Sequence, residues 1–171
     1  MTKSQSMFAA MALACALGCT TACDESDVRP EPASSAGGIP GAPAGYDAAL
    51  ATRLGADDYG MKQYVLAFLK SGPTRSQSED EAQRLQRAHL DNIQRLADEG
   101  KLVLAGPFLD SGDVRGIYVF DVRTVDEARA LTESDPSIKA GRLVMELHPW
   151  YGSAALGMLN DWNRAIAKKS I

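Results

Sequence analysis

The amino-acid sequence predicts an α+β domain whose strands and helices follow one another in the order β-α-β-β-α-β. Two helical segments each begin with a capping-box pattern, Ser78 with Glu81 and Thr124 with Glu127. Four segments rich in β-branched and aromatic residues surround these helices in the places that the order requires. The chain has 171 residues, of which 45% are hydrophobic, an ordinary composition for a single globular domain.

Turn-forming residues bound each of the six elements. We expect strands at residues 62–70, 102–105, 116–122 and 143–150, and helices at residues 78–99 and from 124 to about 134. Gly100 is a suitable residue to end the first helix, and "SDPSIKAG" after the second helix is a loop or a single turn. This order is that of the ferredoxin-like fold, an antiparallel four-stranded sheet with both helices on one face.

The strands predict that both faces of this sheet are apolar. We expect the face away from the two helices to carry five large side chains: Tyr64, Phe68, Tyr118, Phe120 and Val144. Two helices cover one face only, so we expect a homodimer that buries the other. An alternative cover is the C-terminal segment 152–171, an amphipathic helix with an apolar stripe that includes Trp162 and Ile166.

The N-terminal residues predict export to a bacterial cell envelope. Residues 1–18 have a positive start and an apolar stretch that is too short to span a bilayer, as in a signal peptide. "ALGC" resembles the lipobox of bacterial lipoproteins, which makes Cys19 the expected lipidation site and Cys23 the alternative. A plain secretory signal with incidental cysteines is also possible. With a lipid on Cys19 or Cys23, the protein would face the periplasm or the exterior and would be held to the membrane by that lipid alone.

Residues 19–61 predict a spacer between this anchor and the domain at residues 62–151. The segment "DESDVRPEPASSAGGIPGAPAG" contains almost no large apolar residue, so it cannot offset its chain entropy and is expected to be disordered. A short helix is possible at residues 46–55, ending at Gly55.

Charge and motifs exclude several classes of function. The net charge is −4, and residues 62–171 contain fifteen acidic and fifteen basic residues, so no basic stripe suggests nucleic-acid binding. All three cysteines lie within the first 23 residues, which removes a cysteine nucleophile from the domain. Glycine-rich phosphate loops, serine elbows and metal-ligand spacings are also absent from the sequence. We therefore expect no cofactor and no metal.

Two polar residues stand out as candidates for a functional site. His89 shares a helical face with Leu85, Ile93 and Leu96, where a histidine is either a core residue bonded to a backbone carbonyl or a pocket residue. Asp135 precedes a proline, where an aspartate commonly caps a turn. The other histidine, His148, alternates onto the sheet face away from the helices and is expected at the surface or an interface.

Four sequence pieces between residues 62 and 151 resemble the YCII-related domain family. They are "AHL", "EGKLVLAGP", "SDPSIKAG" and "ELHPW", in this order. The resemblance implies a dimeric α/β-barrel of the ferredoxin-like class, with an active site formed by the histidine of "AHL" and the aspartate of "SDP", here His89 and Asp135. It also implies that activity is possible, because one relative is a dehydrochlorinase that acts on a chlorinated hydroxyquinone. Ser137 and Ile117 depart from the family pattern, so the substrate type does not carry over.

Two functional hypotheses follow from this reading. In the first, the protein is a small enzyme in which His89 acts as general acid or base and Asp135 orients the ring by a direct hydrogen bond or a water bridge. In the second, it is a non-catalytic module that binds a small molecule or assembles at the membrane through the same pocket. Gly106, Pro107 and Ser137 are expected to line that pocket. The sequence does not name the small-molecule ligand.

Overall fold

The structure is a computed structural model and describes residues 44–169. Cys19, Cys23, the predicted signal peptide and residues 19–43 of the predicted spacer lie outside the described residues. The elements are α1 Ala48–Leu54, β1 Met61–Ser71, α2 Glu79–Asp98, β2 Leu102–Pro107, β3 Val114–Phe120, α3 Val125–Thr132, α4 Pro136–Lys139, β4 Leu143–Ser153, the 3₁₀ helix η1 Ala154–Met158 and α5 Leu159–Ile166. Within residues 44–169, no helix is both long enough and apolar enough to cross a bilayer.

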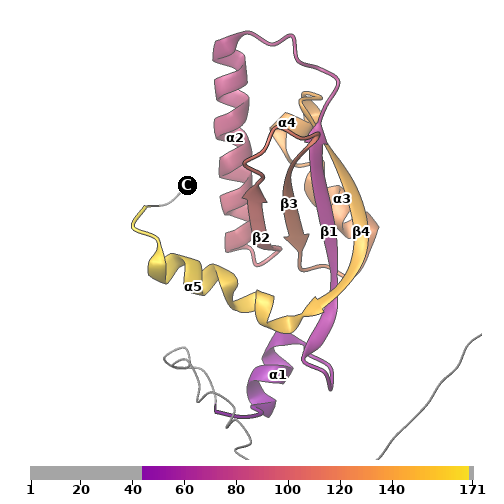
Figure 1. Cartoon of the computed structure of the whole chain (residues 1–171), viewed down its shortest axis with the longest axis vertical. Coiled ribbons are helices and arrows are strands. Elements are labelled where there is room, and N and C mark those ends of the chain that lie inside the picture. The colour runs from indigo at the N-terminus through magenta and orange to yellow at the C-terminus, as the bar shows by residue number, and fades with distance from the viewer. Residues whose placement is uncertain (1–43, 170–171) are drawn as a thin grey trace, which may run out of the picture. The chain divides into compact units, whose positions relative to one another are not determined.

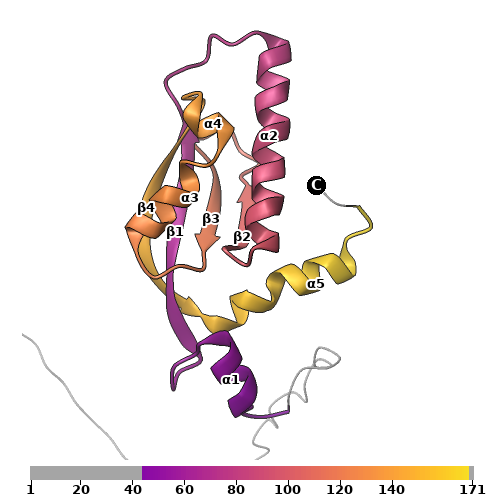
Figure 2. The same cartoon turned by 180° about the vertical axis from the view of Figure 1, so that it is seen from behind.

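The four strands form one antiparallel sheet in the order β2-β3-β1-β4. Helices α2 and α3 pack on the same face of this sheet (Figures 1 and 2). The core between the two layers joins Leu96 of α2 and Ala128 of α3 to Val65, Ala67 and Leu102 of the sheet. This arrangement confirms the predicted ferredoxin-like fold with an additional C-terminal helix.

The two main helices begin where the capping patterns predicted. Thr124 and Glu127 form both hydrogen bonds of the capping box at the start of α3. At the start of α2, Ser78 accepts a hydrogen bond from the backbone of Glu81, while the carboxylate of Glu81 pairs with Arg84 one turn later. Gly100 follows α2 with a φ of 67°, the left-handed conformation that favours glycine.

The register between β1 and β3 corrects one sequence-based expectation. Tyr118 lies opposite Ala67, and Phe120 lies opposite Val65. Because residues directly opposite each other project from the same face of a sheet, Tyr118 and Phe120 face the helices and not a second subunit. Both are almost fully buried in the monomer, so a charge at Phe120 would disrupt the core whatever the oligomeric state.

The face away from the helices is covered only in part. Tyr64, Val103 and Val119 form a small apolar cluster there, with Leu156 of η1 packed against it. Val144 and Trp150 of β4 remain 42% and 37% exposed. The C-terminal segment therefore covers one part of this face, through η1.

Helix α5 does not bury the predicted apolar stripe. It passes the ends of the strands beside β2 (Figures 1 and 2), where the side chain of Asn160 donates a hydrogen bond of 2.8 Å to the carbonyl of Leu102. Because β2 is an edge strand, this bond gives a hydrogen-bonding partner to one of its backbone carbonyls. Trp162 and Ile166 are 45% and 78% exposed, so the domain leaves these two residues of the stripe uncovered.

Candidate active site between helix α2 and the start of helix α4

His89 lies on the inward face of α2, in the middle of the helix. It is 7% exposed and belongs to the same buried face as Asn92 and Leu96. Helical periodicity places it there because residues three or four apart share a face, and Ile93 and Leu96 of that face pack into the core. A polar ring on this face needs a hydrogen-bonding partner, because leaving it unpaired would be costly.

Asp135 supplies that partner from the turn between α3 and α4. It is fully buried and is the N-cap of α4, where its Oδ1 accepts a hydrogen bond of 2.8 Å from the backbone N–H of Ser137. Its Oδ2 lies 2.6 Å from Nδ1 of His89. The Ser137 hydroxyl donates to the carbonyl of Leu85 at 3.1 Å, which holds α4 against α2. The structure therefore brings the two predicted residues into direct contact.

This contact assigns the protons of the imidazole ring. A carboxylate has only acceptor oxygens, so the hydrogen in the contact between Asp135 and His89 belongs to Nδ1. In the neutral ring, Nε2 then carries the lone pair. When Nε2 takes up a proton, the charge that forms on the ring lies beside the carboxylate of Asp135.

Tyr118 is the third member of this group, and sequence reasoning missed it. Its hydroxyl lies 3.3 Å from Nε2 of His89, and the two rings are nearly parallel with centroids 6.2 Å apart. Burial, and then the negative charge of Asp135, raise the pKa of Tyr118 well above its usual value, so the phenol is neutral at physiological pH. Only the register of β3 against β1 reveals this residue, because alternation along β3 alone does not say which face meets the helices.

A second set of hydrogen bonds joins α2 to the turn between α3 and α4 that carries Asp135. The amide oxygen of Asn92, one turn after His89, accepts hydrogen bonds of 3.1 Å from the Ser134 hydroxyl and 2.8 Å from Arg95. Arg95 also donates to the Ser134 hydroxyl at 3.0 Å. The residues on both sides of the His89–Asp135 contact are therefore held by hydrogen bonds, which restricts the geometry of the pair.

His89 and Tyr118 line a pocket of about 590 Å³, whose other lining residues come mainly from α2, β2 and β3. The three residues expected in its lining, Gly106, Pro107 and Ser137, all belong to it. A glycine is required at position 116 of the same wall, because a Cβ there would lie 2.5 Å from the carbonyl oxygen of Gly106. The buried ring of His89 thus has one side on a cavity that a small molecule could enter.

The side chains gathered at this pocket include groups that can accept and donate protons. In residues 44–169, no three side chains of His, Cys, Asp or Glu lie together in a way that could hold a metal ion. His148 takes no part in the site: it lies exposed on the other sheet face, where its Nε2 is 2.8 Å from a carboxylate oxygen of Glu146. The pocket therefore presents one histidine with a carboxylate behind it and a phenol beside it.

Comparison with known proteins assigns the family. A family model, the YCII-related domain, matches residues 66–151. Among solved structures, 5-chloro-2-hydroxyhydroquinone dehydrochlorinase (TftG) from Burkholderia phenoliruptrix AC1100, in complex with 2,5-dihydroxybenzoquinone, is similar, with 25% sequence identity and a TM-score of 0.40. That match covers 51% of this chain and 92% of the other. No curated protein matches the chain. Because the family model spans half of its sequence, the chain belongs to the YCII-related domain family.

Proposed function

We propose that this protein is a small enzyme that uses His89 as a general base and general acid on a small molecule bound in the pocket. The observation that carries the proposal is the 2.6 Å contact between the buried Asp135 carboxylate and Nδ1 of a histidine that lines a cavity. A base needs a free lone pair within reach of substrate, and the proton on Nδ1 leaves that lone pair on Nε2. Asp135 acts through His89 and is a positioning residue.

The proposed reaction begins with removal of a proton from a carbon or oxygen atom of the substrate by Nε2. In an elimination, the electrons of the broken C–H bond form a new double bond while the leaving group departs with its bonding pair. The proton held on Nε2 then passes to the leaving group or to water, which restores the neutral ring. In a hydrolysis, Nε2 would take its proton from a water molecule, whose oxygen bonds to an electrophilic carbon of the substrate. The leaving group then departs with its bonding pair and receives the proton from Nε2.

Tyr118 supports either course as a hydrogen-bond donor. Its raised pKa keeps the hydroxyl protonated, so the phenol can donate to Nε2 in the free enzyme or to an oxygen that gains negative charge during the reaction. The 3.3 Å distance from Nε2 is long for such a bond, so the bond is weak and a substrate atom can replace it at little cost.

The test is a screen of carbon acids and hydroxyquinones with the full chain in D2O, followed by proton NMR. We expect at least one compound to lose a C–H signal or a leaving group in the presence of the wild type. This activity should be lost in His89→Gln and retained in His148→Gln, which removes the other histidine of the chain. Activity that persists in His89→Gln would refute the proposal. Compounds that raise the melting temperature without reacting would favour the alternative, a non-catalytic binding module.

We further propose that the enzyme works as a homodimer on a bacterial membrane. Support for the dimer comes from the resemblance to dimeric relatives and from Val144 and Trp150, which are large apolar side chains exposed on the half-covered sheet face. Support for the anchor comes from the sequence alone, in which an apolar stretch leads to Cys19. Several acyl chains hold a protein firmly to a bilayer, whereas one holds it weakly.

A further inference from the structure

Three arginines line the pocket together with His89 and Tyr118. They are Arg75, Arg115 and Arg142, and the lining contains no aspartate or glutamate. The domain as a whole is neutral, because residues 62–171 carry equal numbers of acidic and basic residues. Basic side chains therefore outnumber acidic ones around this cavity, although the domain is neutral.

The fold brings these arginines together from three separate segments. Arg75 lies in the connection from β1 to α2, Arg115 lies in β3, and Arg142 immediately precedes β4. The backbone N–H of Gly72 donates to the carbonyl of Arg142 at 2.8 Å, and a Cβ at Gly72 would lie 2.1 Å from the carbonyl oxygen of Gly141. This close contact places Arg75 beside Arg142, and the Arg75 guanidinium donates to the Arg142 carbonyl at 3.4 Å.

Within residues 44–169, the guanidinium groups of all three arginines donate hydrogen bonds to neutral oxygens. Arg142 donates to the side-chain oxygen of Gln77 at 2.9 Å, Arg75 to the Ser71 hydroxyl at 3.1 Å, and Arg115 to the Gly112 carbonyl at 3.4 Å. Several arginines elsewhere in the domain pair with carboxylates instead, as in Arg84–Glu81, Arg95–Glu99 and Arg164–Asp161. The pocket arginines are thus oriented but not neutralised.

We propose that the pocket selects a small organic anion, with a carboxylate held by Arg142 and Arg75 and an apolar body lying against Leu90, Ile93 and Phe108. This inference rests on the proposed function, since it names the substrate class of the His89 site. Guanidinium groups bind carboxylates through paired hydrogen bonds of matching geometry. Arg142 is the main determinant, because it is partly buried while Arg75 and Arg115 are exposed and more strongly screened.

The same positive charge suits the proposed chemistry. Removing a proton from a carbon next to a carbonyl group leaves an enolate, whose oxygen carries negative charge. Fixed cations at the rim of the pocket stabilise that charge as it forms, and the neutral Tyr118 can donate a hydrogen bond to it. A neutral substrate would leave the three arginines without an ionic partner.

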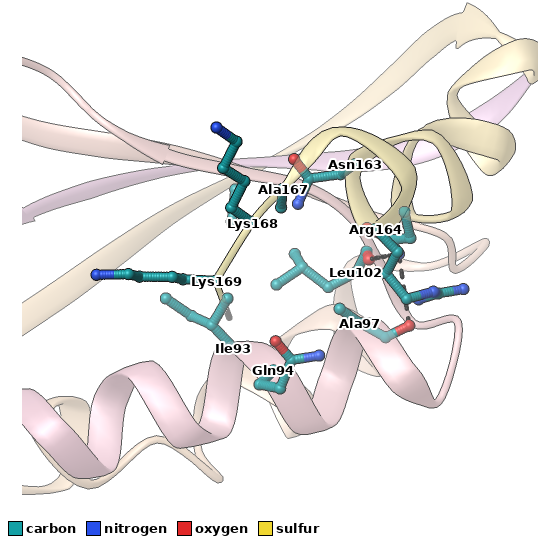
Figure 3. Close-up of a pocket in the computed structure, with 11 residues that line it drawn as sticks. Ile93, Gln94, Ala97, Leu102, Asn163, Arg164, Ala167, Lys168 and Lys169 are labelled. Atoms are coloured by element: carbon teal, nitrogen blue, oxygen red, sulfur yellow. Dashed lines mark hydrogen bonds between the residues drawn. The ribbon is translucent and has the colours of Figure 1, made fainter. Parts of the chain in front are cut away.

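A second basic cavity gives a contrast within the same domain. It has a volume of about 430 Å³ and lies between α2, β2 and α5, with Arg164, Lys168 and Lys169 around it (Figure 3). Its lining shares Ile93 and Ala105 with the site pocket but contains no histidine, tyrosine or carboxylate. Arg164 is already paired with Asp161. Lys168 lines this second cavity and not the His89 pocket, so it provides a control for a basic residue near the site.

The test compares benzoate with benzamide, a neutral probe of nearly the same shape, by isothermal titration of the full chain. We expect benzoate to bind about tenfold or more tightly than benzamide, as one charge-assisted pair would provide. Arg142→Gln should remove this preference, and Arg142→Lys should restore part of it. Lys168→Gln and Arg129→Gln, which alter basic residues outside the pocket, should leave it unchanged.

Two results would overturn the inference: equal affinity for the two probes in the wild type, or no binding of either at millimolar concentration. The test is independent of catalysis, because His89→Gln should keep the preference for benzoate. If the wild type shows no preference for benzoate but does show turnover that depends on His89, the anion inference is refuted and the acid–base function is retained. An intact preference without turnover in the D2O screen would refute the enzyme proposal and retain an anion-binding pocket.

Discussion

Replacing Asp135 with asparagine should move the imidazole proton of His89 from Nδ1 to Nε2. The amide oxygen of asparagine can still accept from the Ser137 N–H, as Oδ1 does at 2.8 Å. The amide nitrogen would then occupy the position of Oδ2, which is 2.6 Å from Nδ1. Because that nitrogen is a donor, the ring must accept at Nδ1, and the remaining proton must lie on Nε2. The lone pair would no longer face the substrate, and activity should be lost.

The effect of Asp135 substitutions on the free energy of unfolding follows from the burial of the His89–Asp135 pair. Asp135 is fully buried and accepts two hydrogen bonds, so Asp135→Ala leaves two buried donors without partners. Each unpaired donor costs about 1–3 kcal/mol, which predicts a loss of about 2–6 kcal/mol in the free energy of unfolding. Asp135→Asn replaces a charge-assisted bond with a neutral one and should cost about 1–2 kcal/mol. The asparagine variant should therefore fold and report on the tautomer.

Long-range ¹H–¹⁵N NMR of the ring nitrogens measures the tautomer directly. The full chain contains two histidines, so a His148→Gln background leaves only the signals of His89. Urea unfolding of the same samples gives the free energies, with Asp126→Asn as a matched control at an exposed position in the first turn of α3. A wild-type ring protonated on Nε2 in its neutral form would contradict the reasoning. So would an unfolding free energy that is unchanged in Asp135→Ala.

Three further predictions concern the anchor, the dimer and alkaline pH. Cys19→Ser should release the protein from bacterial membranes into the soluble fraction, and Cys23→Ser should not; unchanged fractionation in both would disprove lipidation at these positions. Val144→Glu should leave the fold intact, since Val144 is 42% exposed, but should shift sedimentation from dimer to monomer because a dimer would bury the charge. A wild type that sediments as a monomer at micromolar concentration would argue against the dimer. Burial raises the pKa of Tyr64 from 10.0 to about 12, so the unfolded chain loses this proton first and stability should fall between these pH values. Tyr64→Phe should flatten that fall in urea titrations, and an unchanged slope would contradict the assignment.

The sequence by itself determined the order of the elements, and its resemblance to a known family suggested the pairing of His89 with Asp135. Local patterns were sufficient for the elements, because capping residues, glycine and strand composition act within a few residues of one another. They placed the start of α2 after Ser78 and the start of α3 after Thr124, as the structure has them. The His89–Asp135 contact came from resemblance to a family, since spacing along the chain does not relate two residues 46 positions apart.

The tertiary structure alone decided what surrounds that pair. Alternation along a strand says which residues share a face, but only the register against the neighbouring strand says which face meets the helices. For this reason Tyr118 and Phe120 were predicted on the wrong side, and Tyr118 was missed as a neighbour of His89. The arginines of the pocket come from three segments that meet at one end of the sheet. Their shared position depends on long-range packing, which no local pattern encodes.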